Sequence, residues 1–328
     1  MRHSHRVVRP VLAAAVLALV ITITVGIPVL AQLNGRGFVA GPGRVAVRVL
    51  VLTMFDGEAA PWLATESLPI LVPVPGAYAP LHCSSSGLCV TVIGEGKSNA
   101  AASVTAILDD PQLDVHRSYF LTAGIAGTPP RAGTLGFAAW ARWVVDWDLG
   151  HHLRLRSAPQ VPHGYLPGQD VGTNVYQLNG TLVDTAYRLT KNLPLHDTPE
   201  AVAARSHYPG QAGRQPYVAV CDTVTGDDYW AGQELSETAQ YITDLRTHSQ
   251  GRYCTTQQED NATATALARH GYLDRYLSLR TASDFDEPFP GESVSDLLTT
   301  FPGYQAAVEN EYLVGSTVAH DLLTHGFR

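Results

Sequence analysis

The apolar positions of the chain fall into short runs, separated by longer stretches in which apolar residues recur at helical spacing. The short runs are rich in Val, Leu, Ile and aromatic residues and end at glycine, serine or aspartate, which is typical of buried strands. Strands are therefore predicted at 45–52, 88–93, 118–123, 217–222 and 276–282, and residues 134–145 suit one or two more.

The longer stretches predict helices. Ser98 is a suitable N-cap for an alanine-rich helix over 99–108. Further helices are predicted at 174–190, 234–247, 261–269 and 304–325, the last with Val308, Tyr312, Ala319 and Leu322 along one face.

The order of these elements indicates the fold class. Strands alternate with helices, and glycine-containing segments follow several strands, which is typical of a mostly parallel sheet covered on both faces. No linker separates two halves of the chain. We therefore predict an α/β protein with a single three-layer domain over residues 45–328.

The first 31 residues have the pattern of a secretory signal. Arginines at positions 2, 6 and 9 precede the apolar stretch Val11–Val25, and small residues follow before Gln32. This pattern predicts cleavage after Ala31, a flexible lead-in at 32–44 and a secreted or extracytoplasmic protein. The alternative is a membrane-anchored protein held by an uncleaved helix over 11–30, because that stretch is just long enough to span a bilayer.

The charge balance limits the partners of the protein. The chain carries a formal charge of −8, and loss of the three N-terminal arginines would move it to about −11. An acidic surface is repelled by phosphate backbones, so nucleic-acid polymers are excluded as partners.

Four cysteines are present, which in an exported protein favours two disulfides. The spacing suggests that Cys83–Cys89 closes a short loop and that Cys221–Cys254 joins two strands. Four buried thiols are the alternative. A zinc site is not favoured, because neither pair has the C-x-x-C spacing.

A second candidate metal position, His151-His152 near Asp148, is also not favoured. Adjacent histidines in a loop seldom share one ion, so we predict no metal site.

Ser283 and Asp284 directly follow the predicted strand 276–282. In α/β proteins, polar side chains just past the carboxyl end of a strand are where ligands bind. Asp284 is therefore a candidate site residue, and a turn or cap aspartate is the alternative.

Five segments at the ends of predicted strands resemble, in this order, the nucleoside phosphorylase and nucleosidase superfamily. They are MFDGE at 54–58, GEGKS at 94–98, TAGIAG at 122–127, TGDDYW at 225–230 and RTASD at 280–284. TGDDYW, EDNATATAL at 259–267 and the predicted signal are most similar to the branch called purine nucleoside permeases. The resemblance implies a twisted mixed sheet with barrel-like character, a purine nucleoside as ligand, no metal or cofactor, and a homo-oligomer.

The resemblance also assigns the residues that contact the base. A Ser-Asp pair in the superfamily supplies the acid that protonates or hydrogen-bonds purine N7, and Ser283 and Asp284 match it. Cleavage of the N-glycosidic bond leaves electrons on the base, which a partly buried carboxylic acid with a raised pKa can neutralise. Tyr229 and Trp230 match an aromatic pair that packs around the base, with core packing as the alternative.

The ribose site departs from the family pattern. The family places Met-Glu at a helix start to hold the ribose hydroxyls, and Asp260 and Asn261 stand at the matching distance before Asp284. An amide can bond a hydroxyl but cannot place charge opposite a cationic ribosyl transition state. Glu259 or Asp260 could supply that charge in a different register.

The phosphate site also departs from the pattern. Phosphorylases of the family carry an Arg before the GxxG segment and a Ser or Thr after its first glycine, where this chain has Thr122 and Ile125. Gly124, Ile125 and Ala126 are therefore expected to contact substrate without a phosphate cradle. Lys97 is a nearby basic residue, but a solvated lysine is the favoured interpretation. Phosphate as a co-substrate is not favoured.

Glu58 matches the position at which hydrolytic members hold the attacking water. A carboxylate there suits general-base hydrolysis, and a helix-start acid is the alternative. We therefore expect an exported enzyme that cleaves purine nucleosides by hydrolysis. The main alternative is a non-catalytic nucleoside-binding protein that assists uptake, and a structural role is a third.

Overall fold

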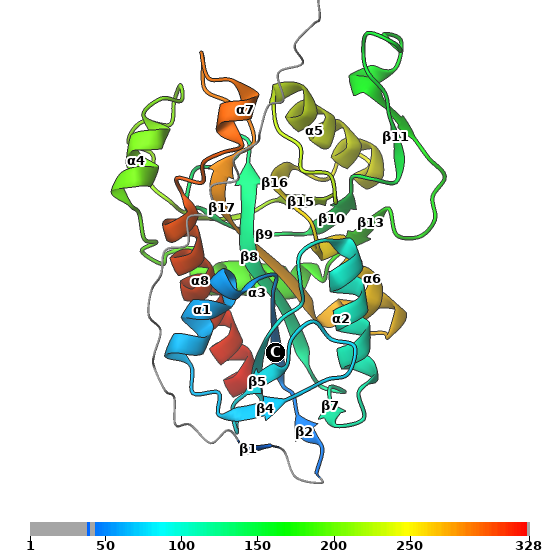
Figure 1. Cartoon of the computed structure of the whole chain (residues 1–328), viewed down its shortest axis with the longest axis vertical. Helices are drawn as coiled ribbons and strands as arrows, with labels where there is room; N and C mark the ends of the chain where they lie inside the picture. The colour runs from blue at the N-terminus through cyan, green and yellow to red at the C-terminus, as the bar shows by residue number, and fades with distance from the viewer. Residues whose placement is uncertain (1–37, 40–42, 327–328) are drawn as a thin grey trace, which may run out of the picture. The chain divides into compact units, whose positions relative to one another are not determined.

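A computed structural model of the chain describes residues 38–39 and 43–326 (Figure 1). The predicted signal peptide, the alternative anchor at 11–30 and most of the predicted lead-in lie outside the described residues. Within the described ranges, none of the helices has the length and apolar character needed to cross a membrane.

Among the described residues, thirteen strands form one mixed sheet, whose main path is paired in a fixed order. That order is β1 (Phe38–Val39), β4 (Ile70–Val72), β5 (Leu81–Cys83), β6 (Leu88–Val92), β3 (Val49–Thr53), β8 (Tyr119–Thr128), β16 (Tyr253–Gln257), β15 (Asp222–Thr225), β10 (Trp143–Asp146) and β13 (Val175–Gln177). A branch from β8 contains β17 (Tyr276–Phe285), β9 (Ala138–Trp140) and β14 (Val218–Val220). Two small pairs lie apart from this sheet, β2 (Val45–Ala46) with β7 (Leu113–Asp114) and β11 (Gly150–His152) with β12 (Tyr165–Pro167).

The sheet branches at the long strand β8. Its first half pairs in parallel with β3, Gly127 pairs with β16, and β17 runs parallel to its whole other edge. The chain passes twice from this branch to the main path, from β9 to β10 and from β14 to β15, through very short connections. The branch therefore lies close to β10 and β15, although the described strands do not close into a barrel.

Helices cover both faces of the sheet (Figure 1). On one face α8 (Tyr304–His325) contacts α1 (Asp56–Thr65) and α3 (Gly180–Thr190), and on the other α2 (Lys97–Asp109) packs against α6 (Asp260–Arg269). The remaining helical segments are α5 (Gln233–Thr247), α4 (Pro199–Arg205), α7 (Val294–Leu297) and the short turns Pro162–Gly164 and Leu273–Arg275. Every residue of β3 and β6 is buried between the two helical layers. The predicted three-layer α/β class is confirmed.

Two predicted helices start at different residues. The helix predicted over 174–190 begins at Gly180, because Asn179 accepts the N–H groups of Thr181 and Leu182 as its N-cap, and Val175–Gln177 forms β13 instead. Helix α2 begins at Lys97, two residues before the predicted start, with Gly96 (φ 84°) in place of Ser98 at the N-cap position. Glycine tolerates this positive φ, so the cap is set by the backbone and not by the serine.

Two segments predicted to follow strands lie inside them. Strand β8 continues through Gly124 and Gly127, and β17 continues through Asp284 to Phe285. The β8–β17 register shifts between Ala282 and Asp284, which leaves Ser283 as an extra residue. Such a bulge redirects side chains at a strand end. Asp284 is therefore a strand residue and not a turn or cap aspartate.

Both predicted disulfides are present. Cys83–Cys89 links neighbouring strands β5 and β6, and Cys221–Cys254 ties the junction of β14 and β15 to β16. The alternative of four free thiols is wrong.

Candidate functional site

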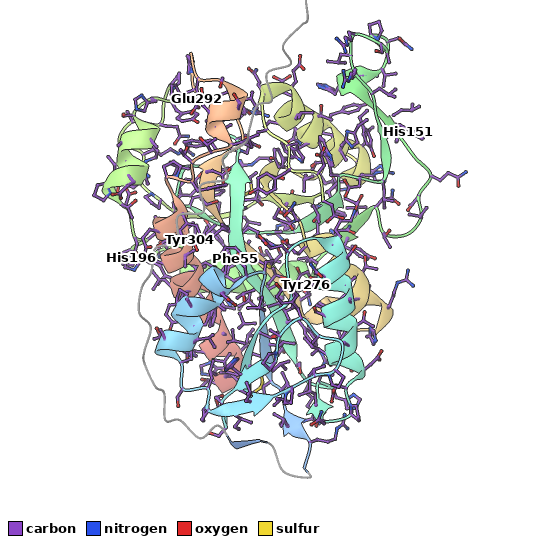
Figure 2. The ribbon with its side chains drawn as sticks, in the orientation of Figure 1. Phe55, His151, His196, Tyr276, Glu292 and Tyr304 are labelled. Atoms are coloured by element: carbon purple, nitrogen blue, oxygen red, sulfur yellow. A yellow bond between two sulfur atoms is a disulfide. The ribbon has the colours of Figure 1, made fainter. Side chains whose placement is uncertain are left out.

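A cleft opens where β8, β16 and β17 meet the loops after β3 and β15. It holds about 710 Å³ of empty space, its open mouth included. Its walls come from segments far apart in the sequence, namely 54–58, 125–127, 226–231, 256–259 and 280–286, together with Glu95 and Leu298. Phe55 of the cleft wall faces Tyr304 of α8, with ring centroids 6.5 Å apart (Figure 2).

Glu58 lies in this cleft at the start of α1, with 1% of its surface exposed. Its Oε2 accepts the Met54 N–H at 2.7 Å and its Oε1 accepts the Ile125 N–H at 2.8 Å. Burial raises the pKa of Glu58 to about 8, although the Arg280 charge and these N–H groups act to lower it. Gly124 does not line the cleft, but a Cβ there would lie 2.7 Å from Glu58 Oε1. The missing side chain therefore makes room for the carboxyl group.

Asp284 and Ser283 line the same cleft. The Ser283 hydroxyl donates to Asp284 Oδ1 at 2.6 Å. Burial raises the pKa of Asp284 to about 7, against the lowering effect of that hydrogen bond. Asp284 pairs with Gly127, two residues along β8 from Ile125, which holds Glu58. A strand rises ~3.3 Å per residue, so the β8 residue that pairs with Asp284 and the β8 residue that bonds Glu58 lie roughly 7 Å apart.

The aromatic pair is divided between the mouth and the wall of the cleft. Tyr229 is 60% exposed, whereas Trp230 is buried and stacks on Trp147 with ring centroids 4.7 Å apart. Trp230 also lies 5.9 Å from the ring of Tyr253. Both members line the cleft. Tyr229 is therefore free to cover a flat ligand. Trp230 mainly packs in the apolar cluster behind the cleft wall.

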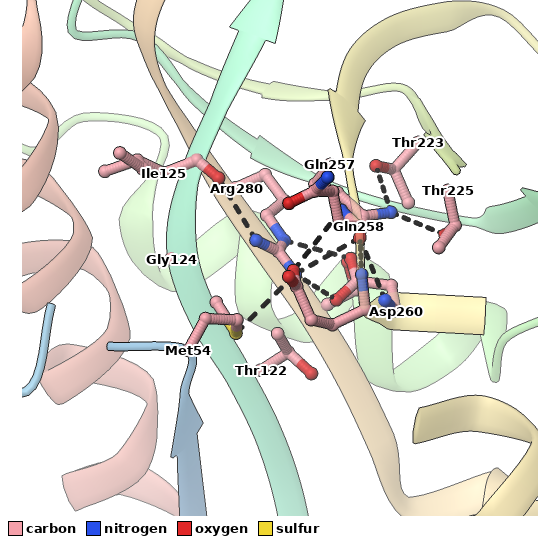
Figure 3. Close-up of polar contacts among 12 residues, drawn as sticks. Met54, Thr122, Gly124, Ile125, Thr223, Thr225, Gln257, Gln258, Asp260 and Arg280 are labelled. Carbon is pink, nitrogen blue, oxygen red and sulfur yellow. Dashed lines mark hydrogen bonds and ion pairs between the residues drawn. The ribbon is translucent and has the colours of Figure 1, made fainter. Parts of the chain in front are cut away.

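Arg280, which sequence reasoning did not single out, lies at the centre of a buried polar network in this cleft (Figure 3). Its Nη2 bonds Asp260 Oδ1 at 2.7 Å and Glu259 Oε2 at 3.0 Å, and its Nη1 donates to the Ile125 carbonyl at 3.1 Å. The guanidinium is thus bound to acids of the protein itself. The signal was present in the sequence, because an arginine inside the apolar strand YLSLRTA needs buried partners.

The start of α6 presents Glu259 to the cleft instead of Asn261. The Asn261 amide donates to the Thr173 carbonyl at 2.8 Å, and Asp260 is fully buried against Arg280 and Ser278. Neither of these two predicted contact residues lines the cleft. Glu259 does line it, and accepts the Gly96 N–H at 2.9 Å. Glu259 therefore stands where the helix start meets the ligand space.

Lys97 does not line the cleft. Its Nζ lies 2.6 Å from Asp146 Oδ2 and 2.8 Å from Asp148 Oδ2. The expectation of a solvated lysine is therefore wrong, because two carboxylates neutralise it.

Carboxyl groups dominate the charge of the cleft. Arg280 is the one cation among its described lining residues, and it is already ion-paired. The carboxyl groups are Glu58, Glu95, Asp228, Glu259, Asp284 and Asp286. Asp286 is a further residue that sequence reasoning did not single out. A cleft of this charge favours neutral or cationic ligands over anions.

The two adjacent histidines belong to a different region. His151 lies on β11 and is exposed (Figure 2). His152 follows it on the same strand, and its ring stacks on Trp147 with ring centroids 4.2 Å apart. Over the described part of the chain, no group of three His, Cys, Asp or Glu side chains is arranged to hold a metal ion.

Comparison with known proteins gives a consistent family. Residues 46–326 match the family described as purine nucleoside permease. A probable purine nucleoside permease of Schizosaccharomyces pombe is 33% identical over 347 residues, which cover 96% of this chain and 97% of the relative. A purine nucleoside permease of Candida albicans is 32% identical over 303 residues, which cover 84% and 75% of the two chains.

Similar solved structures share the fold. The futalosine hydrolase of Helicobacter pylori has a TM-score of 0.55 at 15% identity and covers 84% of this chain and 98% of its own. The 5′-methylthioadenosine/S-adenosylhomocysteine nucleosidase of Neisseria meningitidis has a TM-score of 0.53 at 18% identity and covers 85% and 100%. The described chain is thus a mixed α/β domain similar to these nucleosidases.

Proposed function

The chain belongs to the purine nucleoside permease family, and on this premise we propose that its cleft binds a purine nucleoside and cleaves the N-glycosidic bond with water. The observation that carries the proposal is the meeting of two acids with raised pKa values, the half-buried Asp284 and the buried Glu58, in one cleft that has no unpaired cation among its described lining residues.

Asp284 is the acid of the proposed reaction. Its pKa of about 7 allows the protonated form to persist near neutral pH and to release its proton when the base accepts it. Protonation or strong hydrogen bonding at purine N7 withdraws the electron pair of the breaking bond into the base. Ser283 fixes the orientation of the carboxyl group through its 2.6 Å hydrogen bond.

Glu58 is the base that activates water. The two backbone N–H groups that it accepts hold its carboxyl group in place at the cleft wall. A cationic ribosyl transition state in the cleft would favour the ionised form of Glu58 and lower its pKa. Ionised Glu58 can then take a proton from the attacking water, while exposed Tyr229 covers the base.

Water is proposed as the nucleophile in place of phosphate. A phosphate dianion would meet a cleft lined by six carboxyl groups and by Arg280, whose guanidinium is held by Asp260 and Glu259. Phosphate sites require donors that are free to bind the anion. The lack of an unpaired cation among the described lining residues therefore favours hydrolysis over phosphorolysis.

A second candidate function is nucleoside binding without cleavage, as part of uptake. Both Glu58 oxygens already accept backbone N–H groups, and no carboxylate stands at position 261. The similar proteins of the two yeasts are named permeases.

We further propose that the protein acts outside the cytoplasm. Both disulfides are consistent with an oxidising compartment, and the N-terminal sequence predicts export. A homo-oligomer is a prediction of the family resemblance.

Product analysis distinguishes these functions. Purified protein is incubated with inosine or adenosine, with and without phosphate, and base and sugar products are separated. The proposal expects free base and ribose at a rate that phosphate does not change. Ribose 1-phosphate would show phosphorolysis, and tight binding without any base would favour the carrier function.

A further inference from the structure

The loop that carries Tyr229 over the cleft depends on neighbouring segments for its position. Tyr229 is 60% exposed, and within the described residues it makes no hydrogen bond of its own. Its neighbour Trp230 stacks on Trp147, which lies in the loop after β10. The place of the Tyr229 ring is therefore set by the backbone of its loop and by the contacts that hold this backbone.

Asp227 ties this loop to three other segments of the chain. Its N–H donates to Asp148 Oδ2 at 3.1 Å, and its Oδ1 accepts the Lys97 N–H at 2.7 Å. Its carbonyl accepts the side-chain amide of Gln258 at 3.3 Å. Asp227 lies two residues before Tyr229, so these hydrogen bonds fix the start of the loop.

The ammonium group of Lys97 holds the carboxylates on either side of Trp147. Its Nζ lies 2.6 Å from Asp146 Oδ2 and 2.8 Å from Asp148 Oδ2. The Asp146 side chain is 1% exposed and that of Lys97 is 21% exposed, so water shields this interaction only in part. Within the described residues, neither carboxylate has a second ion pair. Without the ammonium group, two like charges would repel each other and displace Asp148 from Asp227.

We propose that Lys97 is a positioning residue for the purine base, because its side chain holds Asp148 where Asp148 binds the loop of Tyr229. This proposal rests on the proposed function, in which Tyr229 covers the base. Asp284 and Glu58 are held by other contacts, namely a hydroxyl of β17 and two backbone N–H groups. Loss of the Lys97 charge should therefore weaken binding of the base and leave the chemical step unchanged.

Lys97→Met removes the charge and keeps an apolar stem of similar length. The chain has one other lysine, Lys191, which is exposed directly after α3 and does not line the cleft, so Lys191→Met is the matched control. In the ligand-free protein, amide hydrogen exchange over residues 226–231 should be at least about five-fold faster in Lys97→Met than in the wild type and the control. Exchange across α8 should be equal in all three. Unchanged exchange over 226–231 in Lys97→Met would overturn the proposal.

Asp148→Ala keeps the proposal testable if Lys97→Met does not fold, because Asp148 is only half-buried. This variant removes the bond to Asp227 and leaves the ion pair of Lys97 with Asp146 in place. It should speed exchange over residues 226–231 in the same way. Exchange at the wild-type rate would show that Asp148 does not hold the loop, and the proposal would be wrong.

Binding of the free bases hypoxanthine and adenine, measured by calorimetry, tests the effect on the ligand without any turnover. Lys97→Met should weaken the base that the wild type binds by about 10-fold, since the base loses its stacking partner, and Lys191→Met should not. With inosine as substrate, KM should rise by about the same factor while kcat stays within about two-fold.

A double variant shows whether Lys97 acts through Tyr229. In a Tyr229→Ala background, Lys97→Met should weaken base binding by less than about two-fold further, because the ring that it positions is already absent. A full effect in that background would overturn the proposal. If the wild type binds neither base, the proposed function is wrong, whereas the link from Lys97 to the Tyr229 loop is decided by the exchange measurement alone.

Discussion

Gly124 shows how one absent side chain determines the position of a proposed catalytic group. A Cβ at this position would lie 2.0 Å from Met54 Cε and 2.7 Å from Glu58 Oε1. The methionine end can move, but the Glu58 carboxyl group is held by two backbone N–H groups. An added methyl group would therefore displace the carboxyl group from those donors.

Gly124→Ala should slow base release by about 10-fold or more, because the proposed base leaves its position relative to the attacking water. Nucleoside binding, measured by calorimetry, should change much less, since Asp284 and Tyr229 are not displaced. Gly43→Ala is a suitable control, because a Cβ there meets no atom within 4 Å. Full activity of Gly124→Ala would show that the Glu58 position is not essential.

The sequence could predict Asp284 and Glu58 because both lie in segments that resemble a known superfamily, and the structure brings both into one cleft. It could not place Arg280, because the pattern of β17 is that of an apolar strand and the acids that pair with it come from α6. Asn261 was expected at the ligand from the family resemblance, through its spacing to Asp284, but the first turn of α6 directs its amide to Thr173. Such directions depend on the packing of distant segments.

At the scale of the elements, the long strands β8 and β17 determine the site. Each strand was predicted from its apolar first half, and its predicted end was placed just before a glycine or a serine. Their mutual pairing continues through these residues to Thr128 and Phe285. The helix over 304–325 was predicted at its observed bounds because its pattern is long and periodic, whereas Val175–Gln177 became a strand because it pairs with β10.

The disulfide Cys221–Cys254 holds two strands of the cleft region together, and its loss should cost more than the loss of Cys83–Cys89. The sequence separations are 33 and 6 residues. Loop-closure entropy then gives a stabilisation of about 4 kcal/mol for the longer loop and about 2 kcal/mol for the shorter one.

Urea denaturation of the paired Cys→Ala variants measures this difference. The C221A/C254A variant should unfold at a clearly lower urea concentration than the C83A/C89A variant. Equal midpoints, or the reverse order, would contradict the proposed contribution of the longer loop.

At the scale of the whole molecule, the fold is common to this chain and to nucleosidases that share under a fifth of its residues. A shared fold supports many activities, so the function depends on the residues of the cleft. The acidic balance of the whole chain continues into that cleft, where Arg280 is the single described cation among carboxyl groups. This charge distribution is why hydrolysis is proposed over phosphorolysis.

The proposed reaction depends most on Asp284, and its direct test is base release from inosine in phosphate-free buffer by the wild type, Asp284→Asn and a control variant, Asp274→Asn, at an exposed position that does not line the cleft. We expect the wild type and the control to release hypoxanthine at similar rates. Asp284→Asn should be slower by about 100-fold or more, because an amide cannot give a proton to the base. Equal rates for Asp284→Asn and the wild type would contradict the proposal that Asp284 is the acid of this site.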